Sequence, residues 1–172
     1  MGRPARGFGH YLRDMVYGAL DGVITTMAVI AGATGADLGV RVALILGLAN
    51  LVGDGISMGA SNYLGLKSEI EQAGADVRAE APWRHGLATL AAFVLAGTIP
   101  LLAYLLPRPP GLSLFATAAS LAFVVLAATG AARAPFVGRS PWRSAGEMIV
   151  VGALAGGAAY GVGVMAGALL SG

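Results

Sequence analysis

Apolar residues fill five long runs of the chain, and short polar or glycine- and proline-rich stretches separate one run from the next. Each run holds roughly 20 to 25 residues, which is the length that a helix needs to cross a hydrocarbon core about 30 Å thick. The pattern therefore predicts an all-α polytopic membrane protein with five transmembrane helices. The predicted spans are residues 16–36, 42–66, 86–106, 112–132 and 148–170.

Polar segments flank the predicted spans and complete the domain organisation. Residues 1–15 form an N-terminal tail, and residues 16–172 form one five-helix membrane domain. The loop 67–85 is the longest polar connection, and it is too short to form a second domain. Within the tail, apolar side chains recur at helical spacing, which predicts a short interfacial helix leading into the first span. These side chains are Phe8, Leu12, Met15 and Val16.

Positive charges collect on one side of the predicted membrane domain. Nine of the eleven Lys and Arg residues fall in the tail, in the loop 67–85 or in the connection before the fifth span, whereas only Arg41 and Arg108 fall in the other two connections. Positively charged loops face the cytoplasm. We therefore expect a cytoplasmic N-terminus, a cytoplasmic loop 67–85 and an external C-terminus.

Composition excludes several classes of function. Hydrophobic residues make up 56% of the 172 residues and charged residues only 12%, which is far from the balance of a soluble domain. The basic residues form no stripe with interleaved aromatics, so we expect no nucleic-acid partner. The chain has no cysteine, which excludes disulfides and thiolate metal sites. His10 and His85 are far apart in the sequence, so we expect no histidine-rich metal site.

Acidic side chains interrupt the first two apolar runs. At 1.5 Å per helical residue, Asp21 lies about 8 Å, Met58 about 12 Å and Asp54 about 18 Å from the cytoplasmic end of its span. A charged residue at membrane depth costs about 2.5 to 3.5 kcal/mol, so we interpret Asp54 as functional. The structural alternatives are a protonated Asp54 bonded across helices and an Asp21 that caps a helix broken at Gly22.

The second span has a polar face and a face of small residues. Its polar side chains are spaced by four and therefore share one side of a helix; they are Asn50, Asp54, Met58 and Asn62. The opposite flank carries glycines, which let helices approach closely in lipid; they are Gly47, Gly53, Gly55 and Gly59.

Further acidic residues lie outside the spans or near their ends. Those of the cytoplasmic loop form either a solvated face or a capture site for cations at the cytoplasmic mouth; they are Glu69, Glu71, Asp76 and Glu80. Glu147 begins the fifth span, where it either stabilises a helix N-terminus or belongs to a pathway.

Two long motifs resemble one known family. The stretch YLRDMVYGALDGVITTMAVIAGATGA, followed by LILGLANLVGDGISMGASNYLGLKSE, resembles the vacuolar iron transporter family. That family has V-Y-G-x-x-D-G in the first span, and D-G-x-S-M-G-x-x-x-Y-L with K-S-E in the second. The resemblance implies a five-span homodimer that exports Fe²⁺, and often Mn²⁺, in exchange for protons, along a pathway at the dimer interface. Asp21 and Met58 match metal-path positions of the family, and Asp54 matches an acidic residue of its second motif.

The chain departs from the family pattern in two places. Plant members carry a glutamate where this chain has Asn50, so the carboxylate in the middle of the membrane is one turn further along, at Asp54. Those members also carry a glutamate-rich cytoplasmic domain, whereas this chain has only the connection Lys67–His85. We therefore regard the chain as a short-loop variant, and whether its loop binds metal stays open.

The chemistry of the side chains agrees with metal transport. Carboxylate and amide oxygens with one thioether suit Fe²⁺ or Mn²⁺ better than Mg²⁺ or Ca²⁺. A carboxylate removed from water tends to hold its proton until a cation arrives, which allows proton–metal exchange. We therefore assign proton coupling to Asp54 and Asp21. The predicted metal ligands are Asp21, Asp54, Met58, Asn50 and Glu69.

The sequence thus predicts a homodimeric exporter of Fe²⁺ or Mn²⁺ with no resident cofactor and no enzymatic activity. The alternatives are an uncoupled cation channel and a membrane scaffold whose glycines serve only helix packing. The Ala-, Gly- and Arg-rich composition favours a bacterial cytoplasmic membrane. The sequence does not rank Fe²⁺ against Mn²⁺.

Overall fold

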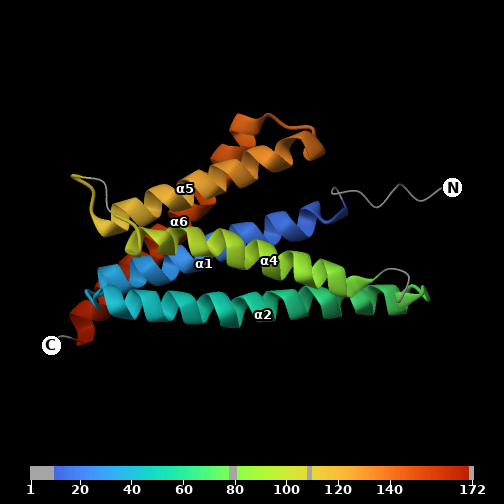
Figure 1. Ribbon diagram of the computed structural model, residues 1–172, viewed down its shortest axis with the longest axis horizontal. Coiled ribbons are helices and arrows are strands. Elements are labelled where there is room, and N and C mark those ends of the chain that lie inside the picture. The colour runs from blue at the N-terminus through green and yellow to red at the C-terminus, as the bar shows by residue number, and fades with distance from the viewer. Residues whose placement is uncertain (1–9, 78–80, 108–109, 171–172) are drawn as a thin grey trace.

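A computed structural model describes residues 10–77, 81–107 and 110–170. Within these ranges the chain is helical without strands, and five helices are long and apolar enough to cross a membrane. The predicted all-α fold with five spans is therefore confirmed (Figure 1). The five long helices are α1 (Leu12–Gly35), α2 (Val40–Gln72), α4 (Pro82–Leu101), α5 (Leu114–Arg133) and α6 (Pro141–Leu170). Two short 3₁₀ helices, η2 (Leu102–Tyr104) and η3 (Ala134–Val137), follow α4 and α5.

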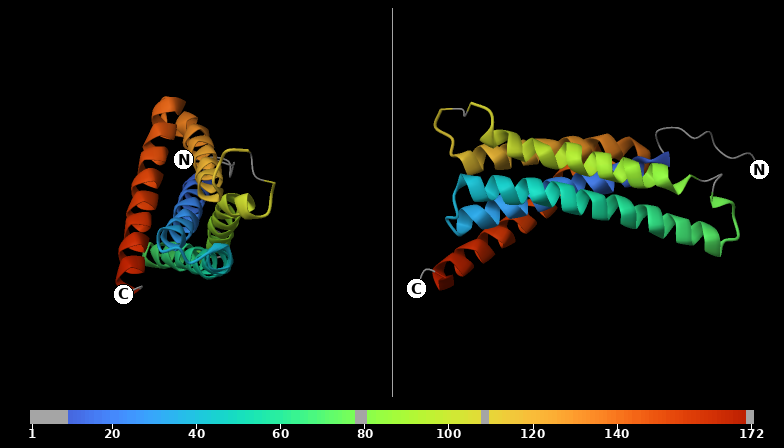
Figure 2. Two further views of the ribbon diagram at one scale, coloured as in Figure 1. Left: turned by 90° about the vertical axis from the view of Figure 1, so that its left-hand side faces the viewer. Right: turned by 60° about the horizontal axis from the view of Figure 1, so that its bottom comes forward.

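The first helix lies at the centre of the bundle. It contacts all four other long helices, and the view along the bundle in Figure 2 shows α1 between α6 and α4, with α5 and α2 on the remaining sides. Because five helices alternate in direction, the start of α1 and the end of α6 lie at opposite ends of the molecule (Figure 1). The start of α1, the end of α2 and the start of α4 share one end, which we call the α1-start end.

Glycines allow α1 to pack closely against both neighbours. Gly18 and Gly22 face the backbone carbonyls of Thr89 and Phe93 on α4, so that a side chain at either position would collide with them. On the other side, Gly163 of α6 meets the carbonyl of Gly32. Small residues of this kind let dispersion forces hold helices together in lipid, where apolar burial supplies no driving force.

The apolar core follows from this central helix. Val23, Ile30 and Phe93 are fully buried between α1 and α4, and Leu126 extends the core to α5. Outward-facing side chains are also apolar; Leu95, Leu154 and other large residues are mostly exposed. A surface of exposed leucine and valine is the pattern expected where lipid replaces water.

Several helix boundaries differ from the apolar runs, and α6 begins at Pro141 instead of residue 148. The second helix continues beyond Leu66 to Gln72, and its last turns are supported by an ion pair of 3.7 Å between Lys67 and Glu71. Glu69 therefore lies on a helix instead of in a loop. Hydropathy marks where a helix leaves lipid, and a polar helix can continue beyond that point.

The start of α1 also differs from expectation. Because α1 runs without interruption from Leu12, Met15 and Val16 belong to its first turns and form no separate interfacial helix. Phe8 lies outside the described residues.

Among the second-span glycines, Gly47, Gly55 and Gly59 pack against α4, but Gly53 has open space around it. The expectation of one glycine flank is therefore wrong at Gly53.

Candidate functional site

The polar face of α2 meets α1 at Asn50. The side-chain amide of Asn50 donates a hydrogen bond of 3.2 Å to Oγ1 of Thr25. The Thr25 hydroxyl in turn donates to the backbone carbonyl oxygen of Asp21, at 2.9 Å. Asn50 thus links the two helices one turn from each predicted carboxylate.

Asp21 and Asp54 lie close enough for their charges to interact. Both side chains are partly buried, and no donor from the described residues forms a hydrogen bond or ion pair with either carboxylate. The alternative of an Asp54 that is hydrogen-bonded across helices is thus not realised within the described chain. The alternative of a helix broken at Gly22 is wrong, because α1 continues through Gly22.

Met58 and Glu69 line one cavity of about 660 Å³ at the α1-start end. Asp21, Asp54 and Asn50 are not among its lining residues. The structure therefore brings the five predicted ligands into two groups, one on the α1–α2 contact and one in the cavity. Among the described residues, no three His, Asp or Glu side chains are grouped so that they could hold one metal ion.

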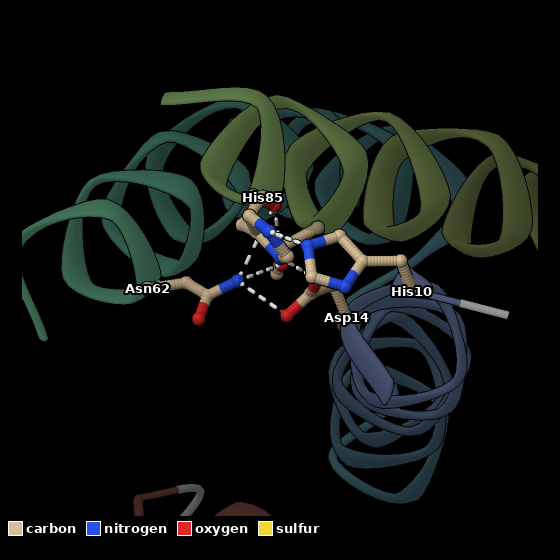
Figure 3. A network of polar contacts seen from close by, with 5 residues as sticks. His10, Asp14, Asn62 and His85 are labelled. Carbon is tan, nitrogen blue, oxygen red and sulfur yellow. Dashed lines mark hydrogen bonds and ion pairs between the residues drawn. The ribbon is translucent and has the colours of Figure 1, made fainter. Parts of the chain in front are cut away.

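A polar network closes one side of this cavity (Figure 3). The carboxylate of Asp14 on α1 lies 2.5 Å from Nδ1 of His85 on α4, and both side chains are buried. Asn62 of α2 donates to Oδ1 of Asp14 at 2.9 Å and to Oγ1 of Thr89 at 2.7 Å. Nε2 of His85 lies 3.1 Å from Nε2 of His10. Three helices thus share one hydrogen-bonded network.

Sequence reasoning missed most of this network. His10 and His85 are 75 residues apart in the sequence, and the fold brings them into contact. Asn62 belongs to the predicted polar face of the second span, but Asp14 is not among the predicted site residues. One signal could have found it, because Asp14 precedes Asp21 by seven residues and so lies on the same helix face.

Glu147 has a structural partner on each side. Its carboxylate accepts from Arg133 and from Arg139, both at 2.6 Å, and Arg133 also donates to Ser144 at 2.7 Å. Glu147 lies in the second turn of α6, which begins at Pro141, so the helix N-terminal role is wrong. These contacts tie the α5–α6 connection together.

Comparison with known proteins places these features in a family. A family model described as the VIT family matches residues 12–81 and 72–164. The chain belongs to the VIT family. The matched ranges contain α1, α2 and the network residues Asp14, Asn62 and His85, but not His10. The five-helix fold makes this VIT-family chain an integral membrane protein.

Relatives of the VIT-family chain carry a consistent name. It is 44% identical over 59 residues to the vacuolar iron transporter of Toxoplasma gondii, a match that covers 34% of the chain and 20% of the relative. It is 26% identical over 212 residues to vacuolar iron transporter 1 of Arabidopsis thaliana, covering 88% of the chain and 84% of the relative. It is 24% identical over 221 residues to vacuolar iron transporter 1 of Oryza sativa subsp. japonica, a match that covers 92% of the chain and 87% of the relative.

Two consequences follow for the earlier expectations. The rice alignment has 221 positions although the chain has 172 residues, so the relative contains residues that this chain lacks. This agrees with a short-loop variant. The relatives are plant and parasite proteins named as vacuolar, so they do not support the expectation of a bacterial cytoplasmic membrane.

Proposed function

We propose that this chain transports Fe²⁺ across a membrane. The observation that carries the proposal is the pair of partly buried carboxylates, Asp21 and Asp54, which lie on two adjacent membrane helices and have no hydrogen-bond donor among the described residues. Unpartnered acidic groups inside a membrane protein are costly and mark ion pathways. The names of the relatives support iron as the ion.

The ion path begins at the cavity of the α1-start end. Glu69 and Met58 line this cavity, and Asp54 lies one helical turn before Met58 on α2. A carboxylate captures the ion, the Met58 thioether favours a first-row transition metal over Mg²⁺, and the Asp21–Asp54 pair then receives it. Mn²⁺ shares this ligand chemistry and is a second substrate.

A homodimer completes the site. One chain supplies too few ligands for an ion among its described residues, and a two-fold axis beside α1 and α2 doubles them. The exposed face of α2 supports this contact, because its small side chains would allow a partner helix to approach closely. These residues are Ala49, Gly53, Ser57, Ala60 and Ser61.

Transport is coupled to protons in this proposal. A carboxylate held away from water favours its neutral form, and an arriving cation displaces the proton. Asp54 and Asp21 would therefore exchange a proton for a metal ion in each cycle, with metal leaving the cytosol. An uncoupled channel would use the same carboxylates without this exchange, and a scaffold would use neither.

The proposed orientation places the α1-start end in the cytoplasm. It is the end where Lys67, Arg84, Arg133 and Arg139 lie, which agrees with the positive-inside rule. Impermeant labelling of single cysteines at Trp83 and at Leu38 tests it. Labelling of the Trp83 position from the outside would show that the orientation is the opposite of the proposed one.

Flux into proteoliposomes tests the function. The purified chain should move Fe²⁺ across the bilayer faster than protein-free vesicles, and an imposed pH gradient should drive accumulation against the metal gradient. Flux that is independent of the pH gradient favours the channel. No flux above that of protein-free vesicles contradicts transport.

A further inference from the structure

The two histidines of the chain face each other beside the cavity of the α1-start end. Nε2 of His10 lies 3.1 Å from Nε2 of His85, while the ring centroids are 4.7 Å apart. Figure 3 shows the two rings side by side, with a dashed line between the two Nε2 atoms. Both residues line the cavity, His10 exposed and His85 buried.

Asp14 fixes the orientation of His85. Because a carboxylate only accepts hydrogen bonds, the contact of 2.5 Å between Asp14 Oδ2 and His85 Nδ1 places a proton on Nδ1. The lone pair of Nε2 then points toward His10. Asn62 holds the second oxygen of Asp14 at 2.9 Å. Metal-ligating histidines commonly donate a hydrogen bond from the N–H of the other ring nitrogen to a carboxylate, which is itself held by a further hydrogen bond.

We propose that His10 and His85 form a binding site for a divalent transition-metal ion. With metal–nitrogen bonds of about 2.1 Å, two nitrogens 3.1 Å apart subtend an angle of about 95° at the ion. This is close to the right angle between neighbouring ligands of an octahedral ion. Asp14 is the positioning residue, and it does not touch the ion.

The rest of the coordination sphere comes from water in the cavity. The described residues supply no third ligand, and the charged side chains that line the cavity besides Asp14 are Arg13 and Glu69, of opposite sign. Two imidazoles suit Fe²⁺, Co²⁺, Ni²⁺ and Zn²⁺, whereas Mg²⁺ and Ca²⁺ prefer oxygen ligands. Without metal, His10 donates an Nε2 proton to His85; to bind the ion, His10 must carry that proton on Nδ1 instead, so that its Nε2 lone pair is free.

The two ligands of this site are not among the residues proposed for transport, although His10 and His85 line the same cavity as Met58 and Glu69. Asp21, Asp54 and Met58 are not ligands of this site, and binding of metal to it does not depend on transport of metal across the membrane. It could therefore bind metal in a chain that transports nothing.

Nitrogen NMR of the purified full chain tests the site, with Zn²⁺ as a diamagnetic probe. The chain has only two histidines and no cysteine, so histidine-labelled protein gives a spectrum with two imidazoles. One equivalent of Zn²⁺ should shift both Nε2 signals together and leave Nδ1 of His85 protonated. Mg²⁺ should shift neither. A response of one histidine alone, or of neither, overturns the site.

Variants give a second, independent measurement by Zn²⁺ affinity. His10→Asn, at an exposed position, should weaken Zn²⁺ binding by at least tenfold, and Asp14→Asn should weaken it by about 10- to 100-fold. Asp37→Asn, at an exposed position between α1 and α2, is the matched control and should leave the affinity of this site unchanged. Circular dichroism confirms that each variant is folded. Equal Zn²⁺ affinity in His10→Asn and the natural chain contradicts the proposal, and so does an equal loss of affinity in His10→Asn and Asp37→Asn.

Discussion

Gly97 on α4 packs directly against the backbone of Gly22 on α1. A Cβ at Gly97 would lie 2.6 Å from the carbonyl oxygen of Gly22, closer than a carbon atom can approach without moving a helix. We therefore expect Gly97→Ala to lower the free energy of unfolding by about 1–3 kcal/mol, the usual cost of overpacking. Unfolding in detergent micelles measures this change.

Gly146→Ala on α6 is the matched control for Gly97→Ala. No atom lies within 4 Å of its added Cβ, and alanine is the better helix former. Its free energy of unfolding should stay equal or rise. Equal destabilisation by both substitutions would contradict the close contact between α1 and α4.

Removal of the Thr26 hydroxyl should make the protein more stable. It is fully buried on α1, and its Oγ1 has no hydrogen-bond partner in the part of the chain that the structure describes. Thr26→Val keeps the shape and removes the unpaired group, so the free energy of unfolding should rise by about 1 kcal/mol.

Thr89→Val provides the comparison for Thr26→Val. Thr89 is equally buried, but its hydroxyl accepts from Asn62 and donates to the carbonyl of His85. Loss of this hydroxyl should lower the free energy of unfolding by about 1–3 kcal/mol, because Asn62 and the carbonyl of His85 each lose a hydrogen-bond partner. If Thr26→Val costs as much as Thr89→Val, the Thr26 hydroxyl has a partner after all.

The five helices could be predicted because run length against membrane thickness is a local property of the sequence. The contact between Asn50 and Thr25 could also have been predicted, because residues at similar depths on adjacent antiparallel helices come together. The contacts of His85 with Asp14 and His10 were not, because 71 and 75 residues separate the partners. Periodicity shows which face of a helix is polar, but it does not show which helix will face it.

The helix ends were missed for a different reason. Glu69 and Glu71 are polar enough to end an apolar run, yet helix formation depends on backbone hydrogen bonds and local pairs such as Lys67–Glu71. Transfer to lipid and formation of a helix are separate equilibria. A hydropathy pattern reports only the first of them.

Asp54→Asn should abolish metal accumulation driven by a pH gradient. The amide keeps the shape of the carboxylate but no longer exchanges a proton. Metal binding from the cytoplasmic side should remain measurable, whereas Asp21→Asn should weaken uptake of every metal. Asp37→Asn, at an exposed position between α1 and α2, is the control and should transport normally. Accumulation by Asp54→Asn at the natural rate would refute its coupling role.

Met58→Leu should change selectivity without ending transport. Leucine keeps the apolar volume beside the cavity and removes the sulfur, so Mn²⁺ should still move while discrimination against Mg²⁺ falls. Competition between the two ions in the flux assay measures this ratio. Met165→Leu, at an exposed position on α6, should not affect it. The role of the thioether is wrong if both variants keep the natural order of preference.

Cross-linking should locate the two-fold axis. The chain has no cysteine, so Tyr17→Cys introduces a single thiol on the same face of α1 as Asp21. Tyr17 is 59% exposed and Leu154 on α6 is 70% exposed, which makes Leu154→Cys a fair control. Dimers should form in membranes through position 17 and not through position 154. The reverse result would move the axis to α6.

The glycine contacts on both sides of α1 set how closely the helices of the bundle approach. Helices that meet backbone to backbone at Gly22 and Gly163 leave no room for a side chain, so α1 lies directly against α4 and α6. The second helix meets the α4 backbone at Gly59 and Gly86, whereas Gly47 touches only the flexible end of Leu101. The Gly59–Gly86 contact is therefore where α2 comes closest to the α4 backbone, and a side chain at either glycine would push the two helices apart.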